Sequence, residues 1–186
     1  RRCVMEGIFF ILVASALFSH AWYLLGLYTD GRMMGTIMGA CAVGMLVLLT
    51  FTPQLVGTEG TELSKLGQIT VMKSIVIAWA VYALAVAAHG IWELDDRAIG
   101  FYAIPLVAVT AVGLSYFASV GPRYYDIGVW LSLTVVGSLL TISGAVLFFY
   151  LAVPFRVLRL VTAGAFLGFS PFIAAIGFVV TATAIS

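Results

Sequence analysis

Charged residues divide the chain into six long stretches that contain no charge. These stretches cover residues 7–29, 33–58, 74–92, 98–122, 127–155 and 160–186. A helix needs about 20 apolar residues to cross the roughly 30 Å hydrocarbon core of a bilayer. The pattern therefore predicts six transmembrane helices, which we place at about 7–28, 33–51, 68–92, 98–120, 128–152 and 160–184.

The connections between these helices predict how they pair. All are short except 52–67, so consecutive helices should be antiparallel neighbours. The turns at 29–32, 93–97 and 153–159 lie on one side, which predicts an all-α polytopic membrane protein of three helical hairpins. We expect one six-helix transmembrane domain over residues 1–186. Counting Lys and Arg on the two sides places both termini outside, and we expect a bacterial inner membrane.

Composition supports a membrane location and limits which kinds of partner are expected. The chain is 63% hydrophobic and only 9% charged, whereas soluble domains carry about 25% charged residues. A soluble domain is excluded, and the lipid bilayer is the first expected partner. The net charge of +1 leaves no basic footprint, so nucleic acid is not an expected partner.

A short motif, D-x-R-x-x-G, occurs twice, each time at a turn within a predicted hairpin. Asp at the start of a helix can cap free N–H groups, and Gly one turn later permits close helix approach. This repeat favours a fold built from similar hairpins. Its two copies are Asp30, Arg32 and Gly35, and Asp95, Arg97 and Gly100.

Other small residues and prolines lie within the predicted spans. Gly164-x-x-x-Gly168 is a small-residue face of the kind that packs transmembrane helices. Pro171 lies inside the last helix, where a missing N–H kinks the rod and frees a carbonyl. Glu6 and Asp126 precede helices on the outer side, where a carboxylate complements the helix dipole or marks a vestibule.

Two histidines are the candidates for polar chemistry inside the membrane. His20 and His89 both fall in the half nearer the short turns, where they could face one lumen and hydrogen-bond small polar solutes. No nucleophile and base pair, CxxC, HExxH or phosphate-binding loop occurs. Two histidines without an intramembrane carboxylate are too few for a self-contained metal site. We therefore expect no catalytic residue, no metal, no cofactor and no enzymatic activity.

The stretch Leu94 to Ile104 reads L-D-D-R-A-I-G-F-Y-A-I and resembles the L-D-x-R-x-x-G-W-Y-x-L signature of the amide and urea channel family (AmiS/UreI type). Asp126 and Trp130 at the start of helix five, and Gly164 and Pro171 in helix six, extend the similarity over most of the chain. The resemblance implies three hairpins, outer termini, ring-like oligomers and passage of a small neutral solute.

The sequence also departs from that family. Urea channels of this type line helix five with tryptophans, which residues 131–143 lack. Ala163 replaces a helix-six Glu, and the helix-one Asn is replaced at or near His20. These substitutions change the side chains that would line the lumen, and therefore the solute that would pass.

Two functions remain open. The first is a passive channel for a small neutral polar solute of the amide or urea class, with His20, His89, Tyr102 and Trp130 along the pathway. The alternative is a pore-less accessory subunit of a larger membrane complex, such as an oxidoreductase or monooxygenase. A homo-oligomer or other membrane subunits are the corresponding partners. A continuous polar path would favour the channel, and an interior filled by Leu, Val and Phe would favour the accessory subunit.

Overall fold

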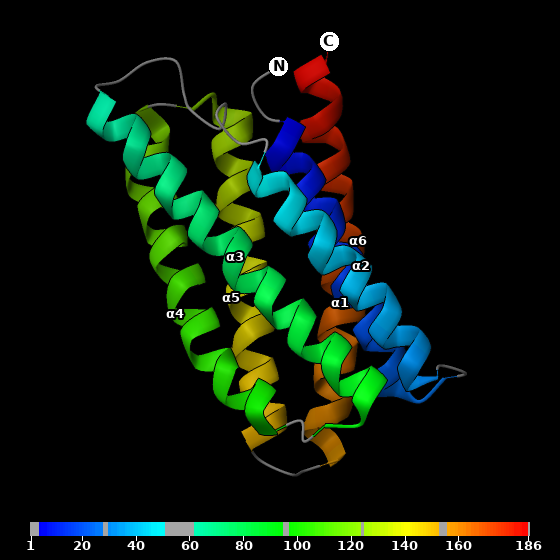
Figure 1. Cartoon of the computed structure of the whole chain (residues 1–186). Helices are drawn as coiled ribbons and strands as arrows, with labels where there is room; N and C mark the ends of the chain where they lie inside the picture. Colours follow the sequence, from blue (N-terminus) through cyan, green and yellow to red (C-terminus); the bar gives the residue numbers. More distant parts are fainter. Residues whose placement is uncertain are drawn as a thin grey trace.

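The computed structural model describes residues 4–27, 30–50, 62–94, 97–123, 125–152 and 156–185. This part of the chain forms six long α-helices (Figure 1). Each is long and apolar enough to cross a membrane, so the prediction of a six-helix integral membrane protein is confirmed. The elements are α1 (Val4–Leu25), α2 (Gly31–Thr50), α3 (Glu62–Trp92), α4 (Arg97–Val120), the short 3-10 helix η1 (Gly121–Arg123), α5 (Ile127–Ala152) and α6 (Arg156–Ile185).

The helices form a closed, antiparallel bundle. Figure 1 shows the first residues of α1 and the last residues of α6 at the same end. Each helix contacts its neighbours along the chain, and α6 returns to contact α1. The most extensive packing joins α1 to α6, α2 to α3 and α4 to α5. The two helices of each predicted hairpin, α1 with α2, α3 with α4 and α5 with α6, contact each other less.

Glycines explain why those three pairs pack most closely. A Cβ atom built on Gly177 of α6 would lie 2.7 Å from the carbonyl oxygen of Gly7 in α1. On Gly35 of α2 it would lie 2.8 Å from the carbonyl oxygen of Ala87 in α3, and on Gly100 of α4 it would lie 2.5 Å from a side-chain carbon of α5. Lipid removes the hydrophobic drive for helices to associate, so close backbone contact at small residues supplies much of the attraction.

Four helix ends differ from the predicted ones by three to six residues, and the first is the start of α1, at Val4 rather than at 7. Helix α1 ends at Leu25, because Gly26 adopts φ 70° and its N–H bonds to the Tyr23 carbonyl at 3.0 Å. Helix α3 begins at Glu62 rather than at 68, and α6 begins at Arg156 rather than at 160. The charges that marked the ends of the apolar stretches do not end the helices, since a helix continues beyond the hydrocarbon into the polar interface. Residue 28 itself, and the predicted end of the second helix at 51, lie outside the described residues.

Arg159 holds the first turn of α6 against the end of α1. Its Nε donates to the carbonyl oxygen of Leu24 at 2.7 Å, and its Nη2 lies 3.4 Å from that of Tyr23. The last carbonyls of a helix lack intrahelical donors and lie at the negative end of its dipole. The guanidinium therefore caps α1, a role that its place in a predicted turn did not indicate.

The turn motif caps α2. The N–H of Arg32 lies 3.4 Å from Oδ1 of Asp30, and the N–H of Met34 donates to the Asp30 carbonyl oxygen at 3.0 Å. Asp30 is therefore the N-cap of α2. In the second copy Arg97 is the first residue of α4, and Asp95 lies outside the described residues.

Replacing Asp30 by Ala removes this cap, and we expect the free energy of unfolding in detergent to fall by about 0.5–1 kcal/mol. The measurement is a denaturation titration followed by helical circular dichroism. Ser115→Ala, an exposed serine within α4, is the control and should leave the midpoint unchanged. Equal stability of Asp30→Ala and wild type would show that the cap contributes nothing.

Candidate functional site

A histidine and a tyrosine form a hydrogen-bonded pair inside the bundle. His20 of α1 and Tyr82 of α3 are both buried, and Nδ1 of His20 lies 2.5 Å from the Tyr82 hydroxyl. The ring of Phe166 from α6 lies against His20, with ring centroids 5.7 Å apart. A buried histidine and a buried hydroxyl each need a partner, and these two side chains satisfy each other.

A second pair continues the polar contacts toward α4. Nε1 of Trp79 donates to Oγ1 of Thr110 at 3.3 Å, and that hydroxyl donates to the carbonyl oxygen of Leu106 at 2.7 Å. The ring of Trp79 lies edge-on to that of Tyr82, with centroids 5.4 Å apart. His20, Tyr82, Trp79 and Thr110, from α1, α3 and α4, are thus hydrogen-bonded to one another or to the backbone.

The four residues predicted to line a solute pathway lie on four different helices, α1, α3, α4 and α5. His20 and His89 do lie along the same α1–α3 contact, since the His89 ring lies against Tyr23, one turn beyond His20. However, Nδ1 of His89 bonds to the carbonyl oxygen of Leu94 at 2.5 Å, at the end of α3. The Tyr102 hydroxyl donates to a carbonyl oxygen of α3 at 3.0 Å.

Trp130, the fourth predicted residue, lies at the other end of the bundle. It belongs to the first turn of α5, and its ring contacts Gly121 in η1. Its Nε1 is buried and makes no hydrogen bond within the described part of the chain. The structure therefore brings the two histidines to one helix contact and leaves Trp130 far from them.

Large side chains pack together between the helices in the described part of the chain. A small space near Thr110, bordered by α1, α3, α4 and α5, measures about 20 Å³, and its other lining residues are apolar. That volume holds about one water molecule. The fully buried side chains around the centre include Phe9, Leu17, Trp79, Tyr82, Leu106, Leu140, Leu147, Phe166 and Ile173.

Glu6, predicted on the outer side, is buried near the start of α1. Its side chain is 3% exposed, and Oε2 has no hydrogen-bond partner among the described residues. The next residue, Gly7, packs against α6, since a Cβ built on it would lie 2.5 Å from the carbonyl oxygen of Gly177. Within the described ranges, no three His, Cys, Asp or Glu side chains gather in a way that could hold a metal ion.

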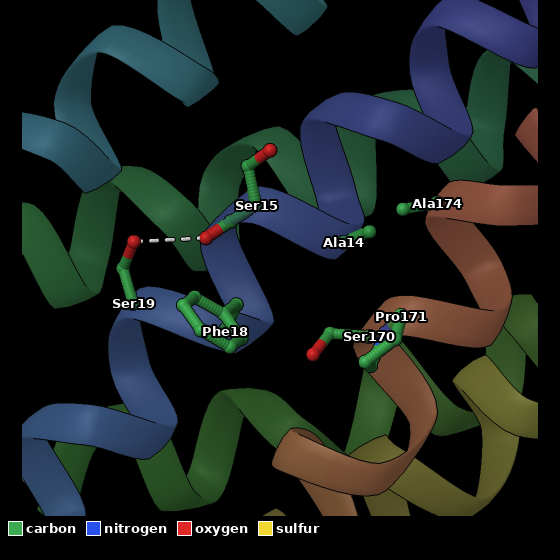
Figure 2. A pocket seen from close by; sticks show the side chains of 7 residues that line it. All are labelled: Ala14, Ser15, Phe18, Ser19, Ser170, Pro171 and Ala174. Carbon is green, nitrogen blue, oxygen red and sulfur yellow. Dashed lines mark hydrogen bonds between the residues drawn. The ribbon is translucent and has the colours of Figure 1, made fainter. Parts of the chain in front are cut away.

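A larger hollow, the α1–α6 pocket, opens between α1 and α6. Its volume is about 340 Å³ (Figure 2). Both Phe18 and Pro171 on its rim are exposed, so the pocket opens on the outer surface of the bundle. The sequence indicated only its proline, because a hollow between two helices depends on their relative rotation. It is lined by Ala14, Ser15, Phe18, Ser19, Ser170, Pro171 and Ala174.

The polar groups of the α1–α6 pocket differ in their bonding. Ser15 and Ser19 donate to the carbonyl oxygens of Ile11 and Ser15, at 2.8 and 2.9 Å. Ser170 is 2% exposed, and its Oγ has no partner among the described residues. In Figure 2 its hydroxyl points from α6 toward Phe18 of α1.

Comparison of the chain with protein-family models, curated proteins and solved structures returns no match. The resemblance to amide and urea channels therefore stays a prediction from the sequence motifs.

Proposed function

We propose that this protein is a non-enzymatic, pore-less structural subunit of a larger integral membrane assembly. The observation that carries the proposal is the core between the described helices, where large aromatic and aliphatic side chains are fully buried. The proposal places the chain in a bacterial inner membrane with both termini outside.

Hydrogen bonding in the interior supports the same function. A channel for a neutral polar solute must offer donors and acceptors that replace the water around the solute. Here His20 is bonded to Tyr82, and Trp79 to Thr110, so these groups stabilise the bundle instead of facing an open path. A solute would have to break those bonds and displace Phe166, which lies against His20.

An open small-residue face on α6 supports a role in assembly. A Cβ built on Gly164 or Gly168 meets no atom within 4 Å, whereas one on Gly177 of the same helix meets the backbone of α1. Small residues spaced by four let two transmembrane backbones approach closely. In this proposal a partner helix, from another subunit or a second copy, covers the face around Gly164 and Gly168.

The test combines isolation in mild detergent with a flux assay. We expect the tagged protein to be recovered from native membranes with other membrane subunits in fixed ratio, as measured by native mass spectrometry. Liposomes containing the purified chain should pass urea and acetamide no faster than empty liposomes in stopped-flow light scattering. Recovery as identical chains alone, together with fast solute flux, would instead support the channel.

The glycine face provides a sharper variant. Gly164→Leu and Gly168→Leu should each reduce recovery of the partner subunits several-fold while leaving the isolated chain folded. Gly128→Leu is the matched control, because Gly128 is equally open but lies at the start of α5. Unchanged recovery in both α6 variants would remove this face from the proposal.

A further inference from the structure

Ser170 differs from the other serines whose side chains the structure describes. Each of the others donates its hydroxyl to the carbonyl oxygen four residues earlier in its own helix, which is the common way to satisfy a serine in an apolar helix. The Ser170 hydroxyl makes no such bond and is buried. The bonded serines are Ser15, Ser19, Ser74, Ser115, Ser119, Ser132, Ser138 and Ser143.

An unpaired hydroxyl is costly at this depth in the membrane. Ser170 lies near the middle of the apolar span Val157–Ala182, and Ser15 near the middle of the span Met5–Leu25. The α1–α6 pocket is therefore close to the bilayer midplane, where water is scarce. A buried hydroxyl without a partner is unfavourable, so a ligand that accepts a hydrogen bond from it gains binding energy.

The size and lining of the pocket indicate what would fit. A volume of about 340 Å³ falls within the roughly 300–1,000 Å³ of small-molecule sites. Its lining residues carry no charge, and an ion at this depth would be expensive. Pro171, beside Ser170, has no N–H to donate to the Leu167 carbonyl, so the helix backbone is also missing a hydrogen bond next to the pocket.

We propose that the α1–α6 pocket binds a neutral, lipid-soluble molecule through one hydrogen-bond-accepting oxygen, such as a carbonyl, held by the hydroxyl of Ser170. Phe18, Ala14 and Ala174 contact its apolar part. A phospholipid headgroup is excluded as the recognised group because it lies about 15 Å away, at the edge of the 30 Å hydrocarbon core. This proposal goes beyond the structural role above and does not depend on it.

The experiment uses a medium-chain ketone that carries a photoactivatable diazirine, with the matching alkane diazirine as the comparison. The full chain in liposomes is irradiated with each probe, and the labelled residues are mapped by mass spectrometry. We expect the ketone probe to label α1 and α6 at the pocket in a saturable manner, with competition by unlabelled ketone. Equal labelling by the alkane probe would overturn the role of the hydroxyl.

Two variants test the site. Ser170→Ala should weaken half-saturating labelling by the ketone probe about two- to tenfold, the effect expected for one hydrogen bond, and leave alkane labelling unchanged. Ala174→Leu should fill the hollow and abolish saturable labelling, with circular dichroism confirming that the helices remain formed. Ser132→Ala, at a half-buried position of α5 outside the pocket, is the control. The proposal would be overturned if Ser170→Ala left ketone labelling unchanged. It would also be overturned if the same labelling, repeated in native membranes, were blocked by a partner helix that covers the pocket.

Discussion

Replacing Gly177 by Leu is expected to separate α1 from α6 and to lower the free energy of unfolding by roughly 3 kcal/mol or more. Even a Cβ atom would lie 2.7 Å from the Gly7 carbonyl oxygen and 2.9 Å from Cβ of Phe10. The obstacle on one side is backbone, which cannot rotate away as a flexible side chain can. The helices must therefore move apart along the most extensive contact of the bundle.

The measurement is a denaturant titration in detergent micelles, followed by circular dichroism and by elution as a single species. Gly164→Leu is the matched control in the same helix, because nothing lies within 4 Å of a Cβ at that position. It should unfold within about 0.5 kcal/mol of wild type. Similar losses in the two variants would show that any large residue in α6 is harmful, and that the Gly177 contact is not special.

Replacing Tyr82 by Phe is expected to cost about 1–2 kcal/mol although it removes a single oxygen atom. The His20 ring would keep its buried position and lose the partner of its Nδ1. Water cannot easily replace that partner, because Phe166 and the surrounding core occupy the adjacent space. The cost is therefore mainly that of an unsatisfied polar group.

A double-mutant cycle separates that cost from a general loss of packing. His20→Leu in the Tyr82→Phe background should recover part of the stability, since both partners are then apolar. Tyr102→Phe is the control, because it also removes a tyrosine hydrogen bond but at a partly exposed site. Additive losses in the cycle would mean that His20 and Tyr82 do not stabilise each other.

The helix ends show where reasoning from charge spacing failed. Charges at 62, 65, 156 and 159 seemed to mark loops, yet Glu62 and Arg156 begin α3 and α6. Apolar content reports where a helix is surrounded by hydrocarbon, not where its backbone hydrogen bonds start. Gly26 was the available clue to the end of α1, because a glycine after a helix commonly adopts positive φ.

The candidate sites show a different limit. Both histidines could be selected as rare ionisable residues in apolar stretches, but neither Tyr82 nor the Leu94 carbonyl could be paired with them in advance. In the sequence Ser170 cannot be told from the other helical serines, and only the structure shows that its hydroxyl lacks a hydrogen bond to the helix backbone. Gly164-x-x-x-Gly168 was predicted to be a packing face, yet a Cβ built on either glycine meets no described atom within 4 Å. The close contact of Gly177 with Gly7 was not predicted.

The sequence by itself determined that this chain is a six-helix membrane protein, where its apolar spans lie, and that consecutive helices are antiparallel. These properties follow from the length of a helix that crosses hydrocarbon and from short connections. Only the tertiary structure decided which helices pack most closely, which large side chains meet in the core, and that a hollow opens between α1 and α6. Those outcomes depend on how each helix is rotated about its axis. In a helix that is apolar all round, hydrophobic periodicity does not set this rotation, and contacts of particular glycines and polar groups do.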